Sequence, residues 1–100
     1  YLFLVQHDCN SVFYYKYIVL WNTNTYGESF DCKFRLQEDG NFVLYSAFDL
    51  KPLYATGTYC NKLNCVKPSI FILQLDCNLV LYQDDKPLIQ IWSSKTKCYN

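Results

Sequence analysis

Polar and apolar residues alternate most regularly between Gln37 and Tyr45. Every second position in this stretch belongs to one set, which is Gln37, Asp39, Asn41, Val43 and Tyr45. Successive side chains of a β-strand point to opposite faces, so a strand here would present these five side chains together. Elsewhere the apolar residues form short runs, and no segment has a sustained helical spacing. The pattern predicts an all-β chain of short antiparallel strands.

The same set occurs three times as the motif Gln-x-Asp-x-Asn-x-Val-x-Tyr, at steps of 31 and 37 residues. The three copies are Gln6, Asp8, Asn10, Val12 and Tyr14; Gln37, Asp39, Asn41, Val43 and Tyr45; and Gln74, Asp76, Asn78, Val80 and Tyr82. At about one in twenty for each residue type, three such matches do not arise by chance. We therefore expect one domain over residues 1–100, made of three repeats at about 1–31, 32–70 and 71–100.

The residues between the motif positions become more apolar toward the end of each copy. Phe13, Leu44 and Leu81 occupy equivalent places there. We expect this face of each motif strand to pack into a core, while the other face presents Gln, Asp, Asn and Tyr together.

Each motif is followed by a polar turn, a short strand that ends in an aromatic residue, and a Ser/Thr-x-Thr pattern. The aromatic residues are Trp21, Tyr54 and Trp92. A unit of about 35 residues cannot bury its apolar face alone, so the three units must share one core. We expect the three aromatic side chains to meet near a pseudo-threefold axis.

Composition narrows the function classes. Lysine plus arginine and aspartate plus glutamate both number 9, so the basic excess typical of nucleic-acid-binding domains is missing. Ten Tyr, seven Phe and two Trp favour strands over helices. The apolar runs are too short to predict a membrane-spanning helix, and the first residues show no signal-peptide pattern.

Six cysteines in so short a chain predict disulfides and an oxidising compartment. Cys9 and Cys77 hold equivalent motif positions, and Cys32 and Cys98 follow them at separations of 23 and 21 residues. Repeat symmetry favours three pairs, Cys9–Cys32, Cys77–Cys98 and Cys60–Cys65. Six cysteines allow fifteen connectivities, so symmetry alone carries this prediction.

Neither a metal centre nor an enzyme is expected. His7 is the only histidine, and no Cys-x-x-Cys pair occurs, so a metal-ligand set is lacking. Glycoside hydrolysis needs two carboxyl groups on either side of one bond, whereas each motif carries one Asp. Asp84 and Asp85 are neighbours in a turn, and a single histidine gives no firm basis for a Ser-His-Asp triad. We expect no cofactor.

The triple motif resembles that of the bulb-type (monocot, snowdrop-like) mannose-binding lectins, and the Trp-x-Ser/Thr-x-Thr pattern is also similar to theirs. The resemblance covers nearly the whole chain. It implies a β-prism II fold, in which three antiparallel four-stranded sheets form a prism with one sugar site on each. Only five residues precede Gln6, which leaves open whether the first sheet is complete. Tyr54 replaces the family's usual Trp, and Cys60, Cys65 and Cys98 are additional to its single bridge.

The resemblance also implies a role for each motif residue. In all three copies Asp and Asn would bind the axial 2-hydroxyl of mannose, Gln the 3-hydroxyl and Tyr the 4-hydroxyl. The chemistry suits these roles, because Gln and Asn offer donors and acceptors, Asp accepts strongly, and Tyr does both. Same-face residues lie roughly 6.6 Å apart along a strand, so they would line a groove of monosaccharide length, with Val as an apolar patch.

Such a site would be weak. A few net hydrogen bonds of about 0.5–1.5 kcal/mol each predict a millimolar dissociation constant, about −4 kcal/mol. Several sites on one molecule would then supply avidity. We therefore expect a secreted or vacuolar/extracellular multivalent lectin, a homodimer or higher oligomer, whose partners are mannose and mannose-rich glycans. Nucleic acid and membrane insertion are not expected.

Two alternatives remain. The motif could serve the fold alone, through polar cross-strand pairs. The chain would then be a protein-interaction member of the same fold, such as a taste-active, antifungal or inhibitory variant. A β-trefoil is the rival threefold architecture, although this motif is not its signature.

Overall fold

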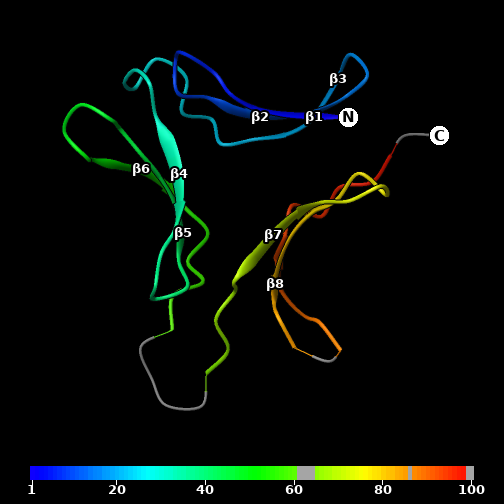
Figure 1. Cartoon of the computed structure of the whole chain (residues 1–100). Helices are drawn as coiled ribbons and strands as arrows, with labels where there is room; N and C mark the ends of the chain where they lie inside the picture. The colour runs from blue at the N-terminus through cyan, green and yellow to red at the C-terminus, as the bar shows by residue number, and fades with distance from the viewer. Residues whose placement is uncertain (61–64, 86, 99–100) are drawn as a thin grey trace.

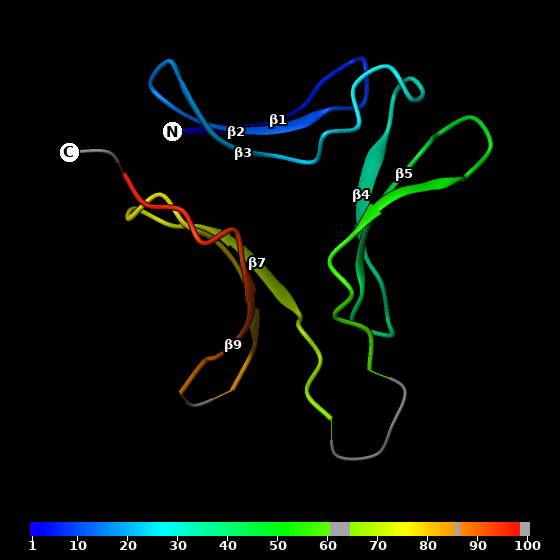
Figure 2. The ribbon, with the colours of Figure 1, turned by 180° about the vertical axis from the view of Figure 1, so that it is seen from behind.

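The structure is a computed structural model that describes residues 1–60, 65–85 and 87–98. Nine strands lie within these residues: β1 (Leu2–Val5), β2 (Ser11–Tyr15), β3 (Ile18–Asn22), β4 (Lys33–Leu36), β5 (Phe42–Tyr45), β6 (Pro52–Ala55), β7 (Ile70–Leu73), β8 (Leu79–Gln83) and β9 (Ile89–Ser93). Each run of three consecutive strands makes one antiparallel sheet. The three sheets surround a common centre, which Figure 1 and Figure 2 show from opposite sides. The described part of the chain has no helix that could span a membrane.

The all-β prediction with three antiparallel sheets is therefore confirmed, but the four strands per sheet are not found. The described residues of each sheet form three strands, in the orders β1-β2-β3, β4-β5-β6 and β7-β8-β9. After β3, β6 and β9 the chain makes isolated backbone hydrogen bonds to the motif, such as Thr23 N–H to the Ser11 carbonyl at 3.0 Å. The residues before Gln6 supply β1, so the first sheet has the same three strands as the other two.

The expectation that each motif is one continuous strand is wrong. Only its second half is extended, as β2, β5 or β8, and its first half forms the turn that joins this strand to the one before it. In the first copy the Gln6 N–H donates to the Asn10 carbonyl at 2.9 Å, and the Cys9 N–H donates to the Gln6 carbonyl at 2.9 Å. The sequence alternation therefore reflects a strand of four or five residues preceded by a tight turn.

One position in this turn has a left-handed backbone. The positive φ angles are 74° at Cys9, 91° at Gly40 and 66° at Cys77. A three-residue loop whose last residue is left-handed is a common way to close a hairpin with a bulge. Gly40 is also crowded, since a Cβ there would lie 3.1 Å from Pro68 Cδ and 3.1 Å from the Thr58 carbonyl oxygen.

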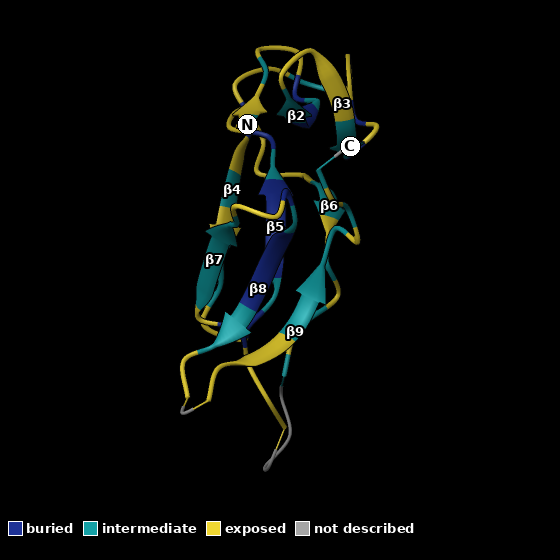
Figure 3. Cartoon of the chain, turned by 90° about the vertical axis from the view of Figure 1, so that its right-hand side faces the viewer, coloured by how far each residue is buried: buried dark blue, intermediate teal, exposed yellow. Residues whose placement is uncertain are grey.

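The middle strand of each sheet carries most of the core. Phe13, Leu44 and Leu81 are fully buried, as the apolar face of the motif predicts. Figure 3 shows β5 and β8 in the colour of buried residues, between more exposed neighbours. A register shift immediately precedes the motif tyrosine in every sheet. Such a bulge increases the local twist of the sheet and curves it around the centre.

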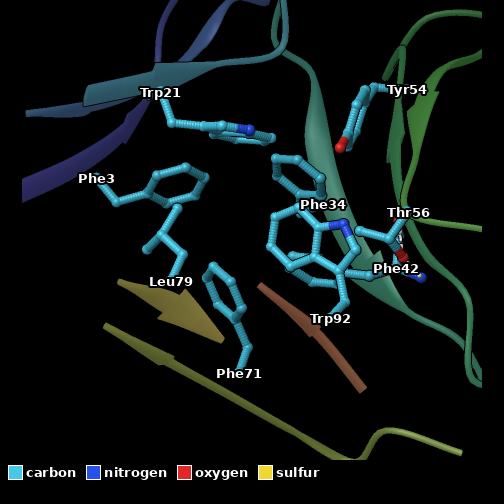
Figure 4. A pocket seen from close by; sticks show the side chains of 9 residues that line it. All are labelled: Phe3, Trp21, Phe34, Phe42, Tyr54, Thr56, Phe71, Leu79 and Trp92. Atoms are coloured by element: carbon cyan, nitrogen blue, oxygen red, sulfur yellow. Dashed lines mark hydrogen bonds between the residues drawn. The ribbon is translucent and has the colours of Figure 1, made fainter. Parts of the chain in front are cut away.

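The aromatic residues that end the third strands meet at the axis, as predicted. The ring centroid of Trp21 lies 5.6 Å from that of Tyr54 and 5.6 Å from that of Trp92, both edge-on. Figure 4 shows these rings converging from different sheets. Together with their neighbours they leave no space for a water molecule. Burial raises the pKa of the Tyr54 hydroxyl, because the charged phenolate is disfavoured away from water.

The first strands add a second aromatic set to the centre, which the sequence analysis did not identify. Phe3, Phe34 and Phe71 hold equivalent places, opposite Phe13, Leu44 and Leu81 in the register. The Phe3 ring centroid lies 5.9 Å from that of Phe34 and 5.7 Å from that of Phe71. Each repeat thus contributes aromatic side chains from two strands to one shared core.

Three disulfides link the cysteines in the pairs that repeat symmetry favours, Cys9–Cys32, Cys60–Cys65 and Cys77–Cys98. Cys9 and Cys32 are buried with Leu44, so this bridge joins the first repeat to the core of the second. Cys77 packs with Phe13 and Leu79 in a second cluster of buried residues. The bridge from Cys77 ties the third motif turn to the segment that follows β9.

We predict that Phe13→Ala lowers the free energy of unfolding by about 3–5 kcal/mol, because it removes a fully buried ring from the shared core. Denaturant unfolding with the disulfides intact would measure this. Tyr17→Ala is the control, since the Tyr17 side chain is 99% exposed and its loss should change stability by less than about 0.5 kcal/mol. Equal losses in both variants would contradict the burial assignment.

Candidate functional site

The motif residues are buried to the same degree in all three repeats. The Gln, Asn and Tyr side chains are half-buried, the Asp side chains are exposed, and the Val side chains are buried. The turn and the strand that follows it bring the polar members to the outer side of each sheet. Three equivalent polar sites therefore recur around the molecule, one on each sheet.

The aspartate closes its own turn. Oδ1 of Asp8 accepts a hydrogen bond from the Asn10 N–H at 3.0 Å, and the Asp39 and Asp76 carboxylates repeat this contact at 2.9 and 3.1 Å. This Asx-type contact holds the turn. It uses one carboxylate oxygen, and within the described residues the other oxygen has no partner and remains available to a ligand.

The asparagine fastens the turn to the segment after the third strand. Oδ1 of Asn41 accepts from the N–H groups of Gly57 at 3.0 Å and Thr58 at 3.2 Å. Oδ1 of Asn10 accepts from the Thr25 N–H at 3.2 Å, and Oδ1 of Asn78 accepts from the Thr96 N–H at 3.3 Å. The amide carbonyl is therefore committed to the fold. The amide nitrogen has no partner within the described residues and can donate two hydrogen bonds to a ligand.

The Ser/Thr-x-Thr pattern is the other half of this fastening, a role that the sequence analysis did not assign. The Thr25 hydroxyl donates to the Cys9 carbonyl at 2.6 Å, and the Thr58 and Thr96 hydroxyls donate to the Gly40 and Cys77 carbonyls at 2.7 and 2.6 Å. The residue between the two hydroxyl side chains is left-handed at Asn24, Gly57 and Lys95. The repetition of the pattern after each motif was the signal that could have identified it.

The glutamine and tyrosine of each motif are joined directly. Nε2 of Gln6 donates to the Tyr14 hydroxyl oxygen at 3.1 Å, and the pairs Gln37–Tyr45 and Gln74–Tyr82 repeat this bond. The tyrosine hydroxyl, which accepts here, keeps its own proton for donation. The glutamine carbonyl remains an acceptor.

Valine does not provide the open apolar patch that was expected. Val12, Val43 and Val80 are 3%, 3% and 0% exposed. Each is flanked by strands on both sides of the sheet, because the motif strand is the middle strand. Valine therefore forms the floor beneath the polar atoms and offers almost no surface of its own.

The first strand of each sheet differs in what it places beside the site. In the second repeat Lys33 and Arg35 are the cross-strand partners of Tyr45 and Val43. The same places hold Leu2 and Leu4 in the first repeat, and Ile70 and Ile72 in the third. Directly opposite residues lie on the same face of a sheet. The three sites thus share their polar residues but differ at these two positions of the first strand, which we call the rim of the site.

Grooves lie beside the second site, and two of them contain Arg35. One is lined by Arg35, Leu36, Gln37, Glu38 and Asp39. The other is lined by Lys33, Phe34, Arg35, Tyr45, Ser46, Ala47 and Leu50. The motif therefore borders concave surface at its turn and at its tyrosine.

The remaining acidic residues and the histidine form no metal-binding cluster in the described part of the chain. Within the described residues no set of three or more His, Cys, Asp or Glu side chains could hold a metal ion. His7, whose side chain is 82% exposed, has its Nδ1 3.2 Å from Asp31 Oδ1. Asp84 and Asp85 lie between the second and third strands of the third sheet, away from the motif turn.

The unpaired polar atoms define what the site can bind. Each repeat offers the amide nitrogen of Asn, one carboxylate oxygen of Asp, the carbonyl of Gln and the hydroxyl proton of Tyr. Donors and acceptors are mixed over a small area, with one negative charge. That combination suits a neutral ligand with several neighbouring hydroxyl groups.

Known proteins resemble this chain in sequence and in fold. No family model matches the chain. A mannose-specific lectin of Narcissus pseudonarcissus is 46% identical over 46 residues, which are 46% of this chain and 42% of that protein. One from Galanthus nivalis is 44% identical over 46 residues, 46% of this chain and 29% of that protein. The matched stretch thus spans less than half of the length of these relatives.

Solved structures match over more of the chain. A monomeric monocot mannose-binding lectin from Gastrodia elata is 32% identical with a TM-score of 0.79, covering 96% of this chain and 80% of that chain. The mannose-specific agglutinin of snowdrop (Galanthus nivalis), complexed with methyl-α-D-mannoside, is 35% identical with a TM-score of 0.71, covering 97% of this chain and 80% of that chain.

We predict that Thr25→Val destabilises the protein by about 1–3 kcal/mol, because it leaves the buried Cys9 carbonyl without its hydroxyl donor. Denaturant unfolding would measure the loss. Tyr26→Phe is the control, since it removes a hydroxyl from the next side chain, which is 69% exposed. If Thr25→Val were as stable as the control, the hydrogen bond from the Thr25 hydroxyl to the Cys9 carbonyl would not stabilise the fold as proposed.

Proposed function

Because the chain belongs to the bulb-type (monocot) mannose-binding lectin family, we propose that it is a metal-independent lectin that binds terminal mannose at three sites, one per repeat. The observation that carries the proposal is the threefold recurrence of the same unpaired polar atoms on the outside of the sheets. The proposal treats residues 1–100 as a single lectin domain of three repeats.

We assign the sugar contacts to the fifteen motif residues. Asp and Asn bind the axial 2-hydroxyl, because a free carboxylate oxygen and a free amide nitrogen can accept from and donate to one hydroxyl. Gln accepts from the 3-hydroxyl through its carbonyl, and Tyr donates to the 4-hydroxyl. Val supplies the floor rather than an exposed patch, which is consistent with its burial. These assignments distinguish mannose from glucose, whose 2-hydroxyl is equatorial.

Each site is expected to bind mannose weakly, so firm binding of a glycan depends on several sites acting together. A dissociation constant of about 1 mM corresponds to about −4 kcal/mol. Three sites on one chain, multiplied by assembly into a homodimer or higher oligomer, give avidity for mannose-rich glycans. The three disulfides indicate an oxidising compartment. We propose a secreted or vacuolar/extracellular protein without enzymatic activity, which acts in defence or glycan recognition.

Titration of the ¹⁵N-labelled protein with mannose and with glucose, each with and without EDTA, tests the proposal. The backbone N–H groups of Asn10, Asn41 and Asn78 lie inside the three turns and report each site separately. Saturable shifts with mannose alone, unaffected by EDTA, are expected. If mannose and a branched mannoside produced no shifts at tens of millimolar, the alternative of a protein-interaction member would replace the lectin assignment.

We predict that Asn41→Asp weakens mannose binding at the second site by about tenfold and leaves the other two sites intact. The substitution keeps an oxygen to accept from Gly57 and Thr58, so the fold is preserved. It removes the amide donor and places a second carboxylate near Asp39, and a hydrogen bond contributes about 0.5–1.5 kcal/mol. The shifts at Asn10 and Asn78 are the internal control. Unchanged binding at all three sites would show that the asparagine amide serves the fold alone.

A further inference from the structure

The rim of the second site is cationic, whereas the rims of the other two are apolar at the same places. Lys33 and Arg35 stand opposite Tyr45 and Val43 on the neighbouring strand, where the first and third repeats have leucine and isoleucine. Both side chains are exposed. Since cross-strand partners share a face, both cations flank the polar side of the motif.

Arg35 borders two of the grooves beside this site. In one groove it lies with Gln37 and Asp39 from the turn, and in the other it lies with Lys33 and Tyr45. A ligand that contacts both the turn and the tyrosine therefore passes Arg35. Within the described residues neither Lys33 nor Arg35 forms an ion pair, so their charges are available to a ligand.

Charges of both signs surround the second site, and the two on the strand beside the motif are both positive. Glu38 and Asp39 line the groove with Arg35, and Asp39 has an equivalent aspartate in each of the other two sites. The Glu38 carbonyl oxygen accepts from Nζ of Lys67 at 3.2 Å, which brings a third cation to this end of the site. Asp49 lies in the turn after Tyr45. Its carboxylate accepts a hydrogen bond from the Lys51 N–H at 3.2 Å. The flanking strands of the first and third sites carry no charged residue.

We propose that the second site prefers mannose that carries a negatively charged ester, a phosphate or a sulfate. This inference rests on the proposed mannose binding and names the ligand class of one of its sites. The arginine guanidinium can donate two parallel hydrogen bonds to such an ester, and the lysine adds a point charge. The motif binds the sugar, and the rim binds the ester. The first and third sites, with apolar rims, take the neutral sugar.

The test is a site-resolved titration of the ¹⁵N-labelled chain with mannose, mannose 6-phosphate, mannose 6-sulfate and glucose 6-phosphate. Mannose 6-phosphate should bind the second site about three- to tenfold more tightly than mannose, the range expected for contacts to two exposed cations. The first and third sites should show no gain. The preference should fall at high salt, because charges are screened beyond about 10 Å at 0.1 M.

The two esters separate the sources of the anion. A phosphate monoester carries about −1.5 to −2 charges at pH 7 and has a pKa near 6, so its advantage should shrink as the pH falls below about 6. A sulfate ester keeps its single charge over that range. A gain with both esters supports a general anion preference, and a gain with phosphate alone supports a phosphate preference.

Two sets of variants assign the effect to the rim. The double variant K33Q/R35Q should lose the gain, so that its dissociation constants for mannose and for mannose 6-phosphate at the second site become equal. Lys16→Gln, in the turn between β2 and β3, is the matched control and should keep it. The double variant L2K/L4R places the same pair opposite Tyr14 and Val12 and should give the first site the preference.

Failure of this inference is distinct from failure of the proposed function. Equal binding of mannose and mannose 6-phosphate at the second site would overturn the inference and leave the lectin assignment standing. So would binding of glucose 6-phosphate as tight as that of mannose 6-phosphate, since it would show an anion contact without sugar recognition. An absence of binding by any mannoside at any site would overturn both.

Discussion

The structure depends on the hydrogen bonds that the motif asparagine accepts from the segment after the third strand. In each repeat this side chain joins the turn before the middle strand to the chain that leaves the sheet, 15 to 18 residues away in sequence. The paired hydroxyl side chains complete the joint from the other side. The same joint orients the amide nitrogen outward and holds the turn aspartate beside it, so one interaction fixes the fold and the polar surface together.

These hydrogen bonds can form because the three sheets share a core. A three-stranded sheet of four- and five-residue strands has little apolar surface of its own, so rings from the first and third strands meet at the centre to complete it. Packing at the axis fixes the third strands, and the third strands carry the segments that the asparagines bind. The outer polar sites are thus positioned by contacts on the opposite face of each sheet.

Much of the fold could be predicted from the sequence, because the motif and the pattern after it occur three times. The period-two spacing correctly indicated strands, and the equivalent places of Phe13, Leu44 and Leu81 correctly indicated the packed face. The turn in the first half of the motif was missed, since a turn of Gln-x-Asp-x-Asn also places polar residues at every second position. The burial of Val43 was missed because it follows from strand order, which alternation alone does not give. Only the register between β4 and β5 shows that Lys33 and Arg35 lie beside the second site, and the sequence does not give this register.

The motif side chains carry some atoms that the fold uses and others that it does not. The fold accounts for the carbonyl of Asn41 and one carboxylate oxygen of Asp39, which are bonded to backbone N–H groups. It does not account for an amide donor, a second carboxylate oxygen and a tyrosine hydroxyl proton that face outward beside one another in every repeat. The outward atoms are identical three times, whereas the rim changes from leucine to lysine and arginine to isoleucine. We infer that the unchanged atoms meet a ligand common to all three sites, and that the changed rim sets what else each site accepts.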